Sequence, residues 1–183
     1  MSLSLELPLG LSLGLPQAIV LLVAAQRLAE LIYSRGNARR LMAEGGVEHG
    51  AGRYPFLVLL HAAWLAALFF FVPPDTAVSW LVIGLYLLLQ AARFWVVASL
   101  GRFWTTRVIT LPDAPLVERG PYRWLRHPNY LVVAAEIAVL PLAFGAWELA
   151  LGFSLANAAV LADRIRIEET ALAPRRNIPG PPS

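Results

Sequence analysis

The sequence predicts an all-α integral membrane protein with about five transmembrane helices. The chain of 183 residues is 58% hydrophobic and only 15% charged, with a mean hydropathy of +0.61, which is too apolar for an ordinary soluble domain. Five apolar segments approach the roughly 20 residues that a helix needs to cross a bilayer, at residues 15–33, 54–72, 77–98, 129–144 and 147–161. Because they occupy most of the chain, we expect a single membrane-embedded domain over residues 1–183.

The first segment resembles a signal peptide in hydrophobicity alone. The residues before it include Glu6 but no basic residue, and no small-residue cleavage site follows, so we interpret it as a retained helix.

Arginine placement predicts the topology, because the chain has no lysine and its arginines cluster after the first, third and fifth segments. They are Arg35, Arg39, Arg40 and Arg53; Arg102, Arg107, Arg119, Arg123 and Arg126; and Arg164, Arg166, Arg175 and Arg176. The positive-inside rule therefore places the N-terminus outside and the C-terminus in the cytoplasm. Most of these arginines fit orientation and contact with anionic membrane lipids, and no nucleic-acid-reading module accompanies them.

Polar residues also fall inside the apolar segments, where charges are costly and are usually paired or functional. They are Gln26, Arg27, Glu30, Gln90, Arg93, Glu136 and Asn157. Arg27 and Glu30 can pair with each other, and Arg93 is close enough to the cytoplasmic end to extend toward the interface. For Glu136 two expectations stand: with Arg93 it lines a substrate tunnel, or it pairs with Arg93.

The last two segments are short and only a few residues apart, which predicts a tight antiparallel hairpin with a break at Pro141 and Gly145. Such a hairpin returns the end of the fifth segment to the start of the fourth. We therefore expect His127 and Tyr130 to lie beside residues 163–169, at one cytoplasmic corner.

The start of the fourth segment combines a cation, an imidazole and a phenol in residues 123–130. His127 should end a loop, with Pro128 in the first helical turn. The free N–H groups of that turn favour an anionic ligand group, and Tyr130 offers a flat face to an adenine ring or a sulfonium. An amphipathic belt at the headgroup level explains the same residues equally well.

At the end of the fifth segment, Arg164 and Glu168 lie four residues apart on one helical face, with Glu169 beside them. On an exposed helix this is an ordinary salt bridge. Facing the predicted corner, the arginine can bind an anionic oxygen, and a carboxylate can accept a proton or face a cationic cofactor.

Several chemistries have little support in the sequence. The chain has no cysteine, which excludes disulfides and thiolate catalysis, and its three histidines lack metal-ligand spacing. The glycines of residues 45–52 are not followed by Gly-Lys-Ser/Thr, and no Rossmann fingerprint is present. We therefore predict no metal site.

Two spaced motifs then carry a resemblance. Gly120-Pro121-Tyr122-Arg123 with Arg126-His127-Pro128-Asn129-Tyr130, followed after a hairpin by Arg164-Ile165-x-x-Glu168-Glu169-x-x-Leu172, resembles the isoprenylcysteine carboxyl methyltransferase family of membrane enzymes. The resemblance implies a three-helix scaffold over residues 1–99, a cofactor and catalytic half over residues 100–172, and a flexible tail over residues 173–183.

The resemblance also implies the cofactor, S-adenosylmethionine, and residue roles. It assigns cofactor binding to Arg126, His127, Pro128, Tyr130 and Glu168, and the reacting end of the acceptor to Arg164 and Glu169.

Residues 26–31, 45–48, 89–93 and 98–104 look like a bacterial branch of this family. That branch is associated with type III polyketide synthases and O-methylates alkylpyrones or alkylresorcinols. The similarity implies O-methylation of a lipophilic small molecule at the cytoplasmic face of a bacterial membrane. Four alternatives remain: carboxyl methylation of isoprenylcysteine, phospholipid N-methylation, an NADPH-dependent membrane reductase, and a non-catalytic membrane adaptor.

Overall fold

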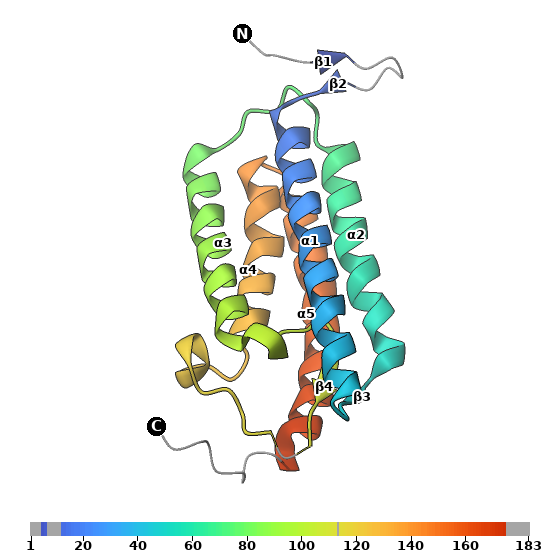
Figure 1. Cartoon of the computed structure of the whole chain (residues 1–183). Coiled ribbons are helices and arrows are strands. Elements are labelled where there is room, and N and C mark those ends of the chain that lie inside the picture. The colour runs from blue at the N-terminus through green and yellow to red at the C-terminus, as the bar shows by residue number, and fades with distance from the viewer. Residues whose placement is uncertain (1–4, 7–11, 113, 175–183) are drawn as a thin grey trace.

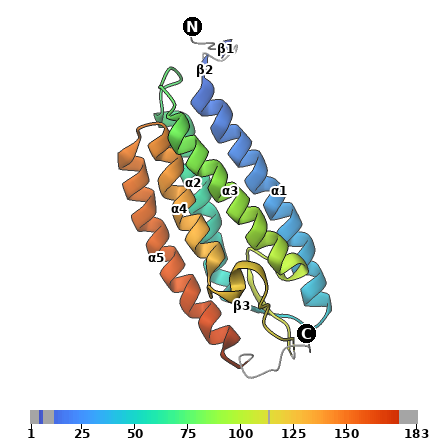
Figure 2. The same ribbon diagram turned by 90° about the vertical axis from the view of Figure 1, so that its left-hand side faces the viewer.

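Five α-helices of the chain run side by side (Figure 1) in the computed structural model, which describes residues 5–6, 12–112 and 114–174. The helices are α1 (Leu15–Ala43), α2 (Tyr54–Phe71), α3 (Trp80–Leu100), α4 (Pro128–Ala143) and α5 (Trp147–Leu172). Around the bundle α1 packs on α2, α2 on α5, α5 on α4 and α4 on α3; Figure 2 shows α4 between α5 and α3. The predicted helical fold class is confirmed.

Three stretches of the described chain are long and apolar enough to cross a bilayer: Leu15–Ala43, Ala51–Phe71 and Trp80–Phe103. The helix α4 is apolar but has 16 residues, about 24 Å at 1.5 Å per residue, against a hydrocarbon core of about 30 Å. The prediction that α5 is a short helix is wrong, because it continues through its polar end to Leu172 and has 26 residues.

The bundle has large apolar side chains on its outside as well as in its core. Leu81, Phe71 and Phe94 are 86%, 76% and 76% exposed, as expected for helices whose outer surface faces lipid rather than water. The buried core joins α1 to α4 through residues such as Trp64 and Leu68. Three long apolar helices with such a surface identify a membrane protein.

The predicted hairpin of α4 and α5 is confirmed, and it turns at Gly145. This glycine has a φ of +68°, the left-handed conformation that usually ends a helix at glycine. The Gly145 amide donates to the Leu142 carbonyl, and the Ala146 amide donates to the Pro141 carbonyl. These two bonds reverse the chain within three residues, so α5 returns along α4.

The connection between α3 and α4, residues 101–127, folds back over the end of the bundle. It contains the 3₁₀ helices η2 (Gly101–Phe103) and η3 (Gly120–Arg123) and the strand β4 (Val108–Thr110). Strand β4 pairs antiparallel with β3 (Val47–His49), and a second small sheet joins β1 (Leu5–Glu6) to β2 (Ser12–Leu13). The sequence analysis did not predict these strands, which are only two or three residues long. A third 3₁₀ helix, η1 (Ala51–Arg53), precedes α2.

Hydrogen bonds from α1 and α2 fix this connection. The Thr106 hydroxyl lies 2.8 Å from the Ser34 hydroxyl and 3.1 Å from the Tyr54 hydroxyl, and the Asn37 amide donates to the Trp104 carbonyl at 2.9 Å. Near its other end, Gly120 has a φ of +58°, and a Cβ atom there would lie 2.0 Å from Ser99 Oγ. Only glycine lets η3 approach α3 this closely.

Candidate functional site

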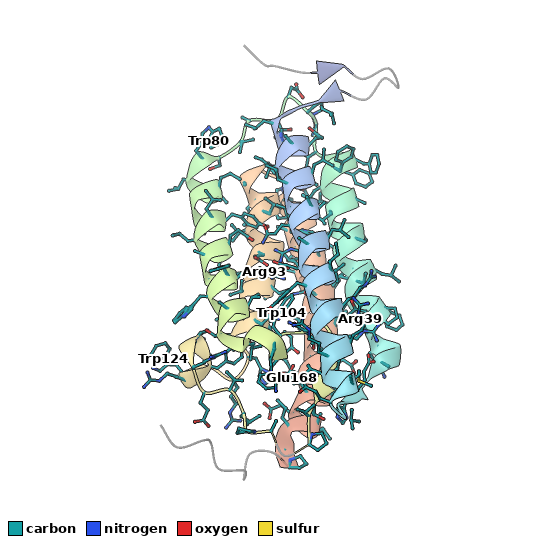
Figure 3. All side chains as sticks on the ribbon, in the orientation of Figure 1. Arg39, Trp80, Arg93, Trp104, Trp124 and Glu168 are labelled. Carbon is teal, nitrogen blue, oxygen red and sulfur yellow. The ribbon has the colours of Figure 1, made fainter. Side chains whose placement is uncertain are left out.

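A cavity of about 440 Å³ lies at the end of the bundle where α4 begins and α5 ends; we call it the main cavity. Glu168 and Trp104 mark this end in Figure 3. Its volume lies in the usual range for small-molecule sites. The charged, amide and phenol groups of its wall belong to Arg107, Glu118, Tyr122, Arg126, His127, Asn129, Tyr130, Arg164, Glu168 and Glu169.

The hairpin places His127 between two carboxylates of α5, as predicted. His127 is the residue before the first turn of α4, with Pro128 at the first helical position. Its Nε2 lies 2.7 Å from Glu169 Oε1, and its Nδ1 lies 3.6 Å from Glu168 Oε1. The imidazole therefore ties the start of one helix to the end of the next.

Tyr130 links Arg164 to Glu168. The Tyr130 hydroxyl donates to Glu168 Oε2, and the Arg164 Nε–H donates to the Tyr130 oxygen at 2.9 Å. The Arg164 guanidinium also lies over the Tyr130 ring, 5.7 Å from its centre. The His127 ring stacks on the same Tyr130 ring, with 5.5 Å between the ring centres. The i,i+4 pair expected within α5 thus meets through a residue of α4.

The charge state of His127 follows from these neighbours. The carboxylates of Glu168 and Glu169 raise the pKa of His127 above its ordinary value of 6.5, and partial burial opposes this only in part. A protonated imidazole is favoured because it sits between two anions. The His127 imidazole therefore stays protonated to a higher pH than the imidazole of a free histidine does.

The two other residues predicted for cofactor binding also reach the main cavity or support it. Arg126 lines the wall and is exposed to solvent. Pro128 is buried as the first residue of α4, where its fixed φ starts the helix without a wasted N–H group. It shapes the turn that holds His127.

Sequence reasoning missed other residues of the wall, among them Arg107, Glu118, Tyr122 and Asn129. Tyr122 belongs to the Gly-Pro-Tyr-Arg motif, which was the available signal, and burial raises the pKa of its phenol. Asn129 Oδ1 and His127 Nδ1 are buried atoms without a hydrogen-bond partner in the described chain. Unpaired buried polar atoms in a cavity wall suit a polar ligand.

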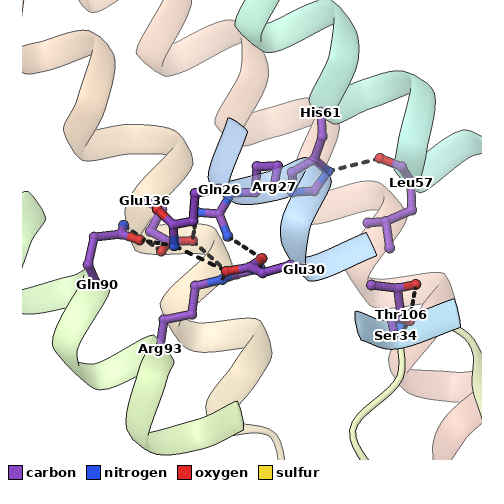
Figure 4. Close-up of polar contacts among 10 residues, drawn as sticks. All are labelled: Gln26, Arg27, Glu30, Ser34, Leu57, His61, Gln90, Arg93, Thr106 and Glu136. Carbon is purple, nitrogen blue, oxygen red and sulfur yellow. Dashed lines mark hydrogen bonds and ion pairs between the residues drawn. The ribbon is translucent and has the colours of Figure 1, made fainter. Parts of the chain in front are cut away.

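Arg93 and Glu136 do not belong to this wall, which corrects the tunnel expectation. They lie inside the bundle, 6% and 2% exposed, and Figure 4 shows them in a polar cluster with Arg27 and Glu30. The alternative expectation is confirmed, because Arg93 Nη1 lies 2.8 Å from Glu136 Oε2. Arg27 also pairs with Glu30 as expected, at 2.9 Å. Arg93 does not extend toward the interface, since both carboxylates bind its guanidinium.

A second cavity of about 290 Å³ lies between α2, α5 and the β3–β4 sheet; we call it the side cavity. One part of its wall is apolar, with Phe56, Leu57, Ala159, Val160 and Ile167. Arg164 and Val108 line both cavities. The two spaces therefore share one cationic side chain.

No group of three or more histidine, aspartate or glutamate side chains suited to a metal ion occurs in the described residues. The tail arginines Arg175 and Arg176, and the expected flexible tail beyond residue 174, lie outside those residues.

Comparison with known proteins connects this site to a family. The model of the isoprenylcysteine carboxyl methyltransferase (ICMT) family matches residues 82–174, which contain most of the main cavity wall. The uncharacterized protein YpbQ of Bacillus subtilis (strain 168) is 34% identical over 158 residues, covering 84% of this chain and 94% of that protein. An uncharacterized protein of Haemophilus influenzae (strain ATCC 51907 / DSM 11121 / KW20 / Rd) is 25% identical over 156 residues, covering 82% and 91%. No solved structure matches the chain.

Proposed function

We propose that this chain, which belongs to the isoprenylcysteine carboxyl methyltransferase family, transfers a methyl group from S-adenosylmethionine to an oxygen atom of a lipophilic small molecule. Membership supports the coarse activity, a membrane methyltransferase. One observation carries the finer proposal: Arg164 lines both the main cavity, with its cluster of charged and phenol side chains, and the partly apolar side cavity.

The main cavity suits S-adenosylmethionine in size and in chemistry. The carboxylates of Glu168 and Glu169 offer negative charge to a sulfonium or an ammonium, and the phenol rings of Tyr122 and Tyr130 offer faces to adenine or to the sulfonium. Asn129 Oδ1, which has no partner in the described chain, can accept a hydrogen bond from the ligand. We assign the predicted cofactor residues Arg126, His127, Pro128, Tyr130 and Glu168 to this side.

The side cavity suits the apolar part of an acceptor. Its α5 wall has the apolar residues Ala159, Val160 and Ile167, with Asp163 and Arg164 between Val160 and Ile167. An alkyl chain held against these apolar residues would bring a polar head group to the arginine. We therefore place the acceptor oxygen between the cavities, with Arg164 and Glu169 at the reacting end.

Methyl transfer requires the protein mainly to align the acceptor oxygen with the methyl group of the donor. Bound S-adenosylmethionine supplies an electrophilic methyl group: an O–C bond forms as the C–S bond breaks, and the positive charge of the sulfonium is neutralised. Arg164 engages only its Nε–H within the described chain, so its terminal N–H groups are free to hold an anionic oxygen. Holding the oxygen in line supplies most of the rate enhancement.

For the acceptor we propose an alkylpyrone or an alkylresorcinol, supplied by a type III polyketide synthase, on the sequence resemblance to that branch. A 4-hydroxypyrone is acidic enough to arrive as an anion, whereas a resorcinol needs a base, and we assign that role to Glu169 of the main cavity wall. The side cavity supports a chain-bearing acceptor of either kind.

We propose that the cavities face the cytoplasm of a bacterial cell. The arginine-rich ends of α1 and α5 and the connection from α3 to α4 all lie at the cavity end of the bundle, and arginine marks the cytoplasmic side. Membrane lipids then contact the outer surfaces of the helices.

The test is a transfer assay with detergent-purified protein and S-adenosylmethionine labelled in its methyl group. We expect label in an alkylpyrone or an alkylresorcinol, from a panel that also holds farnesylcysteine and phosphatidylethanolamine. Label in farnesylcysteine or in the lipid amine would replace the proposed acceptor by that class. Binding of NADPH with no binding of S-adenosylmethionine in calorimetry would overturn the methyltransferase proposal itself.

A further inference from the structure

Four charged side chains in the interior of the bundle form a closed alternating ring: Glu30, Arg93, Glu136 and Arg27 (Figure 4). Arg93 binds Glu30 through two N–H groups at 2.7 Å and Glu136 at 2.8 Å. Arg27 binds the same two carboxylates at 2.9 Å each. We call this the arginine–glutamate ring.

Two glutamines complete the hydrogen bonding of the two carboxylates of the ring, whereas Arg27 Nε is buried without a partner in the described chain. The Gln90 amide donates to Glu136 Oε1 at 2.8 Å, and the Gln26 amide donates to Glu30 Oε1 at 3.1 Å and to the Gln90 oxygen at 2.7 Å. All four carboxylate oxygens of the ring therefore have partners. A network satisfied to this degree favours one arrangement of the helices that carry it over any shifted one.

The ring is unfavourable as a source of stability alone. Charged side chains are costly to place inside a membrane helix, and apolar residues of similar size often replace a buried ion cluster at no loss of stability. An apolar core already joins α1 to α4 near the other end of the bundle. The ring therefore calls for a role other than holding the helices together.

The ring joins three of the four helices that line the main cavity; the fourth, α5, lines it with Arg164, Glu168, Glu169 and Leu172 and gives no residue to the ring. Helix α4 begins with His127, Asn129 and Tyr130, α3 ends at Leu100, and α1 ends near Leu41, all of which line that cavity. Helix α2 gives no residue to the ring, and none of its residues lines the main cavity. His61 of α2 bonds instead to the Leu57 carbonyl of its own helix.

Distance along the helices makes the ring a suitable reference point. Glu136 follows Tyr130 by six residues, about 9 Å, and Arg93 precedes Leu100 by seven, about 10 Å. A slip of α4 by one turn against α1 and α3 would displace Tyr130 by about 5.4 Å relative to Leu41 and Leu100, the wall residues of those two helices. Ser34, one turn after Glu30, bonds to Thr106, which lies between the wall residues Thr105 and Arg107.

We infer that the arginine–glutamate ring sets the axial register of α4 against α1 and α3 and so positions His127 and Tyr130 for the methyl donor. Its four members are positioning residues and touch neither donor nor acceptor. The inference rests on the proposed function for the identity of the ligand, but the register itself is a property of the helices.

The test replaces the whole ring by apolar residues: Arg27→Met, Glu30→Leu, Arg93→Met and Glu136→Leu in one variant. Because no charge is left unpaired, we expect a folded protein with a melting temperature equal to or above that of the wild type. We expect its affinity for S-adenosylmethionine to fall about tenfold or more, since small misplacements of a binding group are costly. Affinity within twofold of the wild type would overturn the inference.

A second readout needs no ligand. The chain has no cysteine, so Leu88→Cys on α3 and Leu131→Cys on α4, both on exposed positions, can take spin labels in the wild-type and ring-free backgrounds. We expect a narrow distance distribution with the ring and a broader or shifted one without it. An unchanged distribution would overturn the inference even if donor binding fell, and this readout stands if S-adenosylmethionine proves not to be the ligand.

The matched control removes an exposed ion pair, Arg102 with Glu44, by Arg102→Gln and Glu44→Gln; these residues lie 3.3 Å apart and outside both cavities. We expect neither readout to change. If the ring-free protein does not fold, Glu136→Gln takes its place, with the same expected direction in both readouts and the same contradicting results.

Discussion

At the scale of single residues, the proposed function gives different tasks to His127 and Arg164. His127 joins both carboxylates of α5 and belongs to the main cavity alone, whereas Arg164 belongs to both cavities. Substitution should therefore separate binding of the donor from transfer to the acceptor.

We expect His127→Ala to weaken binding of S-adenosylmethionine about tenfold, because it removes the charged hydrogen bond to Glu169 and the cation beside Glu168. We expect Arg164→Ala to keep most of that affinity but to lower turnover about a hundredfold, as loss of a group that holds the anionic oxygen does. Calorimetry and the transfer assay measure the two effects, and Arg166→Ala, an exposed arginine on the same helix, is the control. Unchanged affinity and turnover in both variants would refute the site assignment.

The raised pKa of His127 predicts how stability varies with pH. The folded protein binds the proton of His127 more tightly than the unfolded chain does. The protonated imidazole therefore adds to the free energy of unfolding in full below the ordinary pKa of 6.5, and this contribution is lost as the pH rises through the raised pKa of His127. The melting temperature of the wild type should therefore fall relative to that of His127→Gln over this rise. Parallel curves for the two proteins would contradict the placement of the charge.

At the scale of elements, two glycines with positive φ hold the parts of the site in place. Gly145 lets α5 reverse beside α4, and nothing lies within 4 Å of the Cβ position there. Gly120 lets η3 lie against α3, with no room for a Cβ atom beside Ser99. The two positions share a backbone conformation but differ in the space around it.

This difference predicts different outcomes for the same substitution. Gly145→Ala should cost about 1–2 kcal/mol of stability from the left-handed conformation alone and should leave donor binding intact. Gly120→Ala should cost more and should also weaken donor binding, because η3 carries Tyr122 into the main cavity wall. Thermal unfolding and calorimetry distinguish the two, and equal effects would show that η3 does not depend on the close approach.

At the scale of the whole molecule, the two cavities divide the proposed reaction into a donor side and an acceptor side. Val160 lines only the side cavity, so Val160→Trp should fill that space while the donor site stays intact. We expect the KM for long-chain acceptors to rise about tenfold or more with donor affinity unchanged, as partial loss of an apolar site implies. Leu155→Trp, at a 66% exposed position of the same helix, is the control, and equal effects of the two would refute the assignment of the side cavity.

The sequence predicted the site better than it predicted the elements around it. His127, Tyr130, Glu168 and Arg164 meet because a short connection forces a hairpin, and connection length is visible in a sequence. The length of α5 was underestimated because its polar end does not resemble a membrane helix, although it continues the same helix. Arg107 and Glu118 come from the connection of residues 101–127, whose path depends on contacts with α1 and α2 that no local pattern encodes.

The sequence by itself determined the membrane class, the helical fold and the corner where the polar chemistry gathers, because composition, hydrophobic length and loop length are local properties. Only the tertiary structure decided which charges meet. Arg93 and Glu136 have side chains compatible with a tunnel or with a pair, and the choice depended on Arg27 and Glu30 of a helix more than 60 residues away from Arg93. The role of a buried charged side chain depends on the partners that packing brings to it, and packing joins residues that are far apart along the chain.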